Sequence, residues 1–167
     1  LRRLEDLSTL DHLTGIRNRR QFEIDLQQEI LRAKRMKLGL GLLFFDLNRF
    51  KEINDRYGHK AGDWALIQFA QGLSRFARKG TDYCYRLGGD EFIVMLTNIK
   101  NDEIDAIESR IEERLMAEVS GRLPYGLSAS KGFVIWKADE THEELLRRAD
   151  AMMYREKGKR DAPARPS

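Results

Sequence analysis

The chain of 167 residues has the length of one ordinary domain, and its 41% hydrophobic and 34% charged residues are typical of a soluble globular protein. No apolar stretch approaches the ~18 residues that cross a membrane, so the sequence predicts no spanning helix. The net charge of +3 excludes a strongly basic surface, so we expect no nucleic acid among the partners. The single cysteine, Cys84, excludes an internal disulfide and indicates a cytoplasmic location, although the domain can belong to a membrane-anchored protein.

The first ten residues have the pattern of a helix that is ending. Leucines recur at every third position in a charged background, at Leu1, Leu4, Leu7 and Leu10. Such a helix can either connect to an upstream sensory or connector domain or pack against its own domain. We expect the domain itself to cover residues 11–160, followed by a disordered tail over residues 161–167.

The next segments alternate turn, helix and strand patterns. Asp11 and Thr14 are local capping groups in a turn, and a helix is predicted after it over residues 20–36. The continuous apolar run LGLGLLFFDL (38–47) predicts a strand that is buried on both faces.

A polar stretch follows this strand. It has a short helical centre within residues 48–63, and we expect Gly58 and Gly62 to interrupt it. A second helix is predicted over residues 64–77, with Asp63 in a position to cap its first turn.

The second half of the chain predicts a hairpin, a helix, a strand and a final helix. The hairpin turns at two adjacent glycines, and the five elements are expected over residues 83–87, 91–96, 102–119, 127–136 and 143–156. This order predicts an α+β fold, a plait of two split βαβ halves whose mostly antiparallel sheet is covered by helices.

Three acidic residues lie at the ends of predicted strands. Asp46 ends the first buried strand, and Asp90 and Glu91 lie at the hairpin turn. In a plait these ends can meet at one edge of the sheet, where a hard cation such as Mg²⁺ would relieve the repulsion between carboxylates. The other interpretation is a solvated turn and a strand-end cap, and composition alone leaves both open.

Four segments together resemble the GGDEF family, the diguanylate cyclases. YRLGGDEF (85–92) is similar to the family's signature, and the other matches are DHLTGIRNRR (11–20), FFDLNRFKEINDRYGHKAGD (44–63) and RADAMMYREKGKR (148–160). The resemblance implies a fold like the palm domain of polymerases. It also implies a homodimer in which two GTP molecules, one in each half-site, are joined into cyclic di-GMP with release of pyrophosphate.

The resemblance implies a role for each matching residue. Asp46, the carbonyl of Leu47 and Asp90 match metal ligands, for two Mg²⁺ or Mn²⁺ ions per half-site, and Glu91 matches a catalytic residue whose carboxylate supports the metal site. Asn54 and Asp63 match the guanine-recognition pair, since a carboxylate can accept from the adjacent N1–H and N2 amino donors of guanine. Gly88 and Gly89 leave room for the nucleotide. The candidates for phosphate contacts are Lys51, Arg86, Lys157 and Arg160, with Lys159 as the alternative to Arg160.

Three departures from the family pattern accompany these matches. Asn48 replaces the usual second acid two residues after Asp46, and Asp161 replaces a basic residue of the closing helix. The product-inhibition motif, normally Arg-x-x-Asp, has Lys79 and Asp82 at its ends, with Arg110 at the secondary position. Lysine lacks the bidentate fork of arginine, so we expect weakened inhibition by cyclic di-GMP.

The sequence therefore predicts an active diguanylate cyclase. The alternative is a catalytically silent GGDEF module that binds GTP or cyclic di-GMP as a sensor. A general nucleotidyltransferase would follow from the carboxylates alone, and Asp63 argues against it because it favours guanine over adenine.

Overall fold

A computed structural model describes residues 8–161 of the chain, with side chains throughout except at residues 101, 108, 112 and 157–161. The predictions for the leucines at positions 1, 4 and 7 and for the tail over residues 162–167 lie outside this part of the chain. Leu10 is not helical and forms an isolated bridge with Arg17. None of the described helices is long and apolar enough to cross a membrane.

A five-stranded sheet with the strand order β1-β3-β4-β2-β5 forms the centre of the molecule. The strands are β1 (Arg17–Asn18), β2 (Gly39–Leu47), β3 (Asp82–Gly88), β4 (Glu91–Ile99) and β5 (Ala129–Ile135). The helices are α2 (Arg19–Met36), α3 (Phe50–Tyr57), α4 (His59–Phe76), the short η1 (Asn101–Glu103), α5 (Ile104–Arg122) and α6 (His142–Asp161). Every strand pairing is antiparallel except that of β1 with β3, so the predicted plait with a mostly antiparallel sheet is confirmed.

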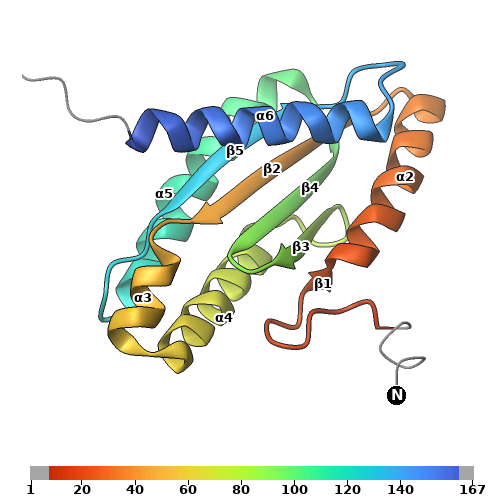
Figure 1. Cartoon of the computed structure of the whole chain (residues 1–167). Coiled ribbons are helices and arrows are strands. Elements are labelled where there is room, and N and C mark those ends of the chain that lie inside the picture. The colour runs from red at the N-terminus through yellow and green to blue at the C-terminus, as the bar shows by residue number, and fades with distance from the viewer. Residues whose placement is uncertain (1–7, 162–167) are drawn as a thin grey trace, which may run out of the picture.

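The sheet separates two hydrophobic cores (Figure 1). Helices α2 and α6 cover one face, where Leu42 and Phe44 of β2 point, and we call this the α2/α6 core. Helices α3, α4 and α5 lie on the other side, where Leu43 and Phe45 point, and we call this the α4/α5 core. The uninterrupted apolar run of β2 is thus explained by burial on both faces, and each fully buried leucine or phenylalanine contributes about 1.5–3 kcal/mol.

Helix α4 begins five residues earlier than the sequence predicted. The prediction that Gly62 interrupts the helix and that Asp63 caps it is wrong, because both lie inside α4. A Cβ atom on Gly62 would come within 1.9 Å of Oδ1 of Asn54 and 3.2 Å of Cζ of Phe50. The glycine at this position therefore lets α3 and α4 approach closely, and the packing between them outweighs the helix-breaking tendency of glycine.

The two-residue strand β1 was not predicted, and a polar network attaches it to the sheet. The guanidinium of Arg17 lies 4.2 Å from the centre of the Tyr83 ring and forms an ion pair with Asp25. Asp25 also accepts a hydrogen bond of 2.8 Å from the hydroxyl of buried Tyr85. These contacts fix the segment before α2 against β3.

Candidate active site

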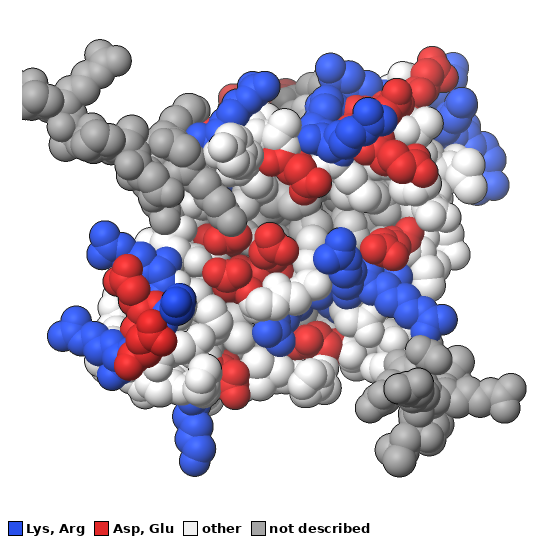
Figure 2. Space-filling view, in the orientation of Figure 1, with Lys and Arg blue, Asp and Glu red and all other residues white. Residues whose placement is uncertain are grey.

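The C-terminal end of β2 lies beside the turn between β3 and β4. Asp46 is directly opposite Glu91 in the pairing of β2 with β4, so the two side chains point to the same face of the sheet. The backbone N–H of Leu47 donates to the carbonyl of Asp90 at 3.1 Å, which ties the strand end to the turn. Asp46 is 7% exposed, whereas Glu91 is open to solvent. Figure 2 shows acidic side chains gathered over this region.

The turn itself depends on its two glycines. Gly88 has φ of 135° and Gly89 has φ of 52°, and the first of these values is accessible almost only to glycine. Apart from the glycine itself and its two neighbours in the chain, no heavy atom lies within 4 Å of the position that a Cβ would take at either residue. The backbone of the turn is therefore open to an approaching ligand.

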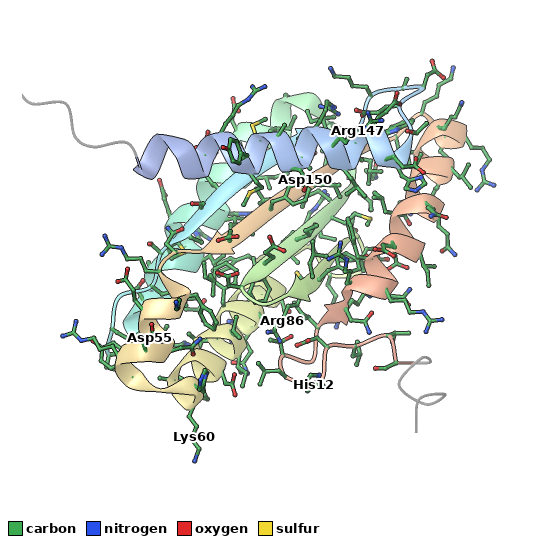
Figure 3. The ribbon with its side chains drawn as sticks, in the orientation of Figure 1. His12, Asp55, Lys60, Arg86, Arg147 and Asp150 are labelled. Carbon is green, nitrogen blue, oxygen red and sulfur yellow. The ribbon has the colours of Figure 1, made fainter. Side chains whose placement is uncertain are left out.

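Arg86 connects this turn to the beginning of the domain (Figure 3). Its Nε and Nη2 donate to the carbonyl of Gly89 at 3.1 and 2.9 Å, and its Nη1 donates to both carboxylate oxygens of Asp11 at 3.0 and 3.2 Å. Asp11 also accepts from the backbone N–H and the hydroxyl of Thr14. Partial burial would raise the pKa of Asp11, but the hydrogen bonds from Thr14 and the charge of Arg86 outweigh it, so this pKa lies below its ordinary value.

The oxygen atoms at this edge have the chemistry that Mg²⁺ prefers. The predicted ligands are the carboxylates of Asp46 and Asp90 and the carbonyl of Leu47, with Glu91 beside them, and all are hard donors. Among the described residues, no group of three or more His, Cys, Asp or Glu side chains converges as a complete metal site. The set fits an ion that is held by one or two carboxylates together with substrate phosphates, which is the usual arrangement for Mg²⁺.

The predicted guanine-binding residues lie on the helical pair α3 and α4. Asn54 lies on α3 and packs against Gly62, and Asp63 is the next residue of α4 and is exposed. The structure thus brings the two predicted residues to neighbouring positions. Tyr125, which the sequence analysis missed, supports this pair by stacking on Tyr57 with ring centres 4.8 Å apart and by donating to the carbonyl of Ala61 at 2.6 Å.

The predicted phosphate-binding residues other than Arg86 lie on helices α3 and α6. Lys51 is exposed in the first turn of α3, directly after the end of β2. Lys157 and Arg160 lie on the last turns of α6, and their side chains, like that of Lys159, are outside the described part of the structure.

Of the residues of the predicted product site, one is buried in an ion pair and two are exposed. Asp82 is 8% exposed and forms a bidentate ion pair with Arg78 through Nε and Nη2 at 2.9 and 2.8 Å. Nη2 of Arg78 also donates to the carbonyl of Thr97 at 2.8 Å. Lys79 and Arg110 are exposed. The sequence analysis missed the role of Arg78, although its spacing of four residues from Asp82 could have suggested the pair.

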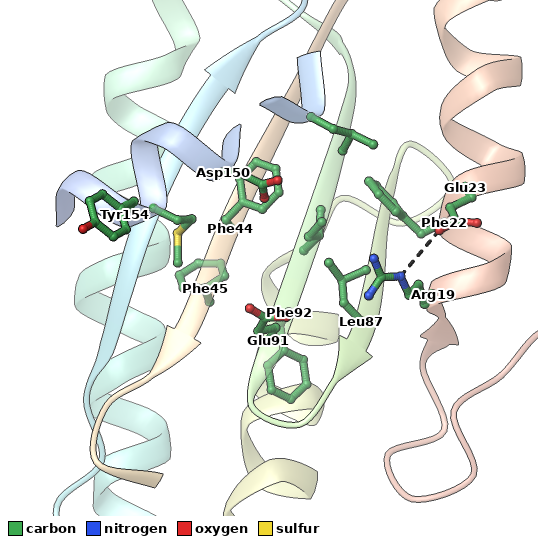
Figure 4. A pocket seen from close by; sticks show the side chains of 13 residues that line it. Arg19, Phe22, Glu23, Phe44, Phe45, Leu87, Glu91, Phe92, Asp150 and Tyr154 are labelled. Carbon is green, nitrogen blue, oxygen red and sulfur yellow. Dashed lines mark hydrogen bonds and ion pairs between the residues drawn. The ribbon is translucent and has the colours of Figure 1, made fainter. Parts of the chain in front are cut away.

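A cavity of about 310 Å³ lies on the same face of the sheet as Asp46 and Glu91, between α2 and α6 (Figure 4). Its lining includes Phe22 and Phe44 from the α2/α6 core, with Glu91 at one end and Asp150 of α6 at its margin. The hollow therefore extends the open surface of the acidic edge across the sheet.

Comparison with known proteins identifies the family of this chain. The family model described as "Diguanylate cyclase, GGDEF domain" matches residues 8–162. The chain is 35% identical over 149 residues to diguanylate cyclase DosC of Escherichia coli K12, covering 87% of this chain and 32% of DosC. It is 37% identical over 153 residues to diguanylate cyclase DgcP of the same organism, covering 90% of this chain and 45% of DgcP. The chain thus spans less than half the length of these curated relatives.

Solved structures agree with this assignment. The GGDEF domain of DgcB from Caulobacter crescentus, in complex with c-di-GMP, superposes with a TM-score of 0.82 at 27% identity, covering 91% of each chain. Diguanylate cyclase SiaD of Pseudomonas aeruginosa, in complex with its activator SiaC, gives a TM-score of 0.83 at 29% identity, covering 94% of this chain and 61% of SiaD. With a match over nearly its whole length, the chain belongs to the GGDEF domain family of diguanylate cyclases.

Proposed function

We propose that this domain is an active diguanylate cyclase that condenses two GTP molecules into cyclic di-GMP and two pyrophosphates. In each step the 3′-hydroxyl of one GTP attacks the α-phosphate of the other, a new phosphodiester forms, and the bond to pyrophosphate breaks. The observation that carries the proposal is the register pairing of Asp46 with Glu91 beside the open Gly88–Gly89 turn, in a chain of the diguanylate cyclase family.

Different side chains bind the guanine base and the phosphates of GTP. Asn54 and Asp63 select guanine, because adenine lacks the adjacent pair of donors that a carboxylate accepts. Lys51 supplies positive charge from the start of α3, and Lys157 with Arg160 does so from α6. Arg86 is the predicted phosphate contact from the hairpin, and its bonds to Asp11 and Gly89 keep its charge at the turn.

The acids Asp46 and Asp90 and the carbonyl of Leu47 would hold Mg²⁺ or Mn²⁺, two ions per half-site, and Glu91 would support them. When bound, such ions neutralise the triphosphate and lower the pKa of the attacking hydroxyl. Asp46 is suited to this role because it is buried at a strand end whose backbone is hydrogen-bonded to the turn.

Each half-site holds one GTP, so the reaction needs two copies of the domain facing each other. We propose that a homodimer forms this arrangement and that an upstream sensory or connector segment of the full-length protein controls it. Turnover per domain should then rise with protein concentration. The domain is expected to work in the cytoplasm, where GTP is available.

The test is to incubate the chain with GTP and Mg²⁺ and to separate the products by chromatography, at several protein concentrations and with a fused dimerising coiled coil. We expect cyclic di-GMP and pyrophosphate in a 1:2 ratio, with ATP giving no cyclic product. Asp46→Asn should abolish turnover, and Asp55→Asn, at an exposed position of α3, is the matched control that should keep it.

If no cyclic di-GMP forms even with the coiled coil, the cyclase proposal fails. Calorimetric binding of GTP or cyclic di-GMP without turnover would then identify the silent sensor module instead. Equal use of ATP and GTP would contradict the assignment of Asn54 and Asp63 to guanine recognition.

A further inference from the structure

Asn48 is held between two serine side chains, one just before the neighbouring strand β5 and one within it. Its Nδ2 donates to Oγ of Ser128 at 2.9 Å, and its Oδ1 accepts from Oγ of Ser130 at 3.0 Å. Its backbone N–H donates to the carbonyl of Ser128 at 2.8 Å. We call these three residues the Asn48 clasp. Both ends of the carboxamide are therefore used, and residue 48 makes two hydrogen bonds to Ser128, just before β5, and one to Ser130 within β5.

The clasp lies directly beside the acidic edge. Ser130 is opposite Asp46 in the pairing of β2 with β5, and the two residues are 6% and 7% exposed. Leu47, between Asp46 and Asn48, is tied on the other side to the turn through the carbonyl of Asp90. The end of β2 is thus anchored to the hairpin by Leu47 and to β5 by Asn48.

We propose that Asn48 is a positioning residue which, through Ser128 and Ser130, fixes the Asp46 carboxylate and the Leu47 carbonyl in the arrangement that binds cation and triphosphate. This inference rests on the proposed cyclase function and assigns a part of its site to the clasp. Residues that hydrogen-bond to metal ligands and orient them typically change metal affinity or activity about 10–100-fold when they are removed.

The chemistry of the carboxamide suits this position. One amide offers a donor to Ser128 and an acceptor to Ser130, so both serines are satisfied without a further charge beside three carboxylates. An aspartate at position 48 could accept from both hydroxyls, because a hydroxyl hydrogen rotates to suit its partner. An alanine could keep only the backbone bond. Asn48→Asp therefore preserves the clasp, whereas Asn48→Ala and Ser130→Ala break it.

The decisive measurement is calorimetric binding of a GTP analogue with a methylene bridge between the α- and β-phosphates, with and without Mg²⁺. We expect Asn48→Ala and Ser130→Ala to weaken Mg²⁺-dependent binding about 10-fold or more, and the double variant to be little worse than either single one. Asn48→Asp should bind at least as tightly as the parent. Binding of the analogue without Mg²⁺ should change little in all four variants, because the guanine contacts lie on α3 and α4.

Ser74→Ala and Gln71→Ala, both on α4 and exposed, are the matched controls and should leave binding unchanged. Thermal melting identifies any variant that fails to fold, and Asn48→Asp keeps the test valid if Ser130→Ala is one of these. The inference is overturned if Asn48→Ala binds like the parent, or if Asn48→Asp is as weak as Asn48→Ala. A parent chain that binds the analogue in this Asn48-dependent way but makes no cyclic di-GMP would refute the cyclase proposal and leave the clasp standing.

Discussion

The ion pair between Arg86 and Asp11 should contribute strongly to stability, because it is largely buried. The two side chains are 11% and 14% exposed, and Arg86 makes four hydrogen bonds, two to Asp11 and two to the carbonyl of Gly89. Removing one partner of a fully buried pair costs about 3–5 kcal/mol, so we expect about 3 kcal/mol for Arg86→Ala at this depth. The coupling energy between the two positions should be about 2 kcal/mol, since a hydrogen bond to a charged group contributes about 1.5–3 kcal/mol.

Urea unfolding at pH 7 of Asp11→Ala, Arg86→Ala and the double variant measures this coupling. The exposed pair Arg19–Glu23 on α2, with side chains 67% and 57% exposed, is the matched control and should give about 0.3–0.5 kcal/mol. Equal coupling at the two pairs would refute the reasoning from burial. The lowered pKa of Asp11 also predicts how the coupling energy depends on pH. The ionised carboxylate contributes its full stabilisation above the ordinary pKa of 3.8, and this is lost as the pH falls through the lowered pKa. The coupling energy between Asp11 and Arg86 should therefore decrease in acid.

Three further predictions concern single positions. Gly62→Ala should displace Asn54, because the new Cβ would lie 1.9 Å from its Oδ1. The substitution should destabilise the fold by about 1–3 kcal/mol and weaken GTP binding. An unchanged GTP affinity by calorimetry would contradict the inference that Gly62 positions Asn54 for the nucleotide. Cys84 is buried, and burial raises the pKa of its thiol to about 12, with a further contribution from the charge of Asp82. A disulfide reagent at pH 8 should therefore label Cys84 only after unfolding. The free energy of unfolding should fall as the pH rises above 9, because the thiol then ionises in the unfolded chain but not in the folded one. Asp82→Ala should destabilise the chain by about 3 kcal/mol by leaving the Arg78 charge without its partner. Micromolar binding of cyclic di-GMP, measured by calorimetry and abolished by this substitution, would contradict the expected weakening of product inhibition.

Much of the fold could be predicted because strong periodic patterns persist in it. The apolar run that became β2, the hairpin around Gly88 and Gly89, and the helices on either side all appear close to their predicted positions. The start of α4 was misplaced because Gly62 was read by its local tendency, whereas its packing against Asn54 decides its conformation. A local pattern contains no information about which surface a glycine will face.

The sequence also predicted only a part of the candidate site. The register of the strands brings Asp46 opposite Glu91, as the plait led us to expect. The partners that fix the site come from distant segments: Asp11 holds Arg86 across 75 positions, and Ser128 lies 80 positions from Asn48. Long-range polar pairs of this kind leave no periodic pattern in the sequence. The short pair Arg78–Asp82 is different, because its spacing of four residues was visible in the sequence and only its burial was not.

The division of the protein into two cores has a consequence for how its specificity can change. The residues proposed to read the base are attached to the α4/α5 core, through neighbours such as Ile53 and Leu66, whereas α6 and its basic end are attached to the α2/α6 core through Leu145 and Ala149. The sheet lies between these packing units, so substitutions beneath one should be nearly additive with substitutions beneath the other. The choice of nucleobase can therefore evolve, or be engineered, without repacking the helix that is proposed to contact the triphosphate.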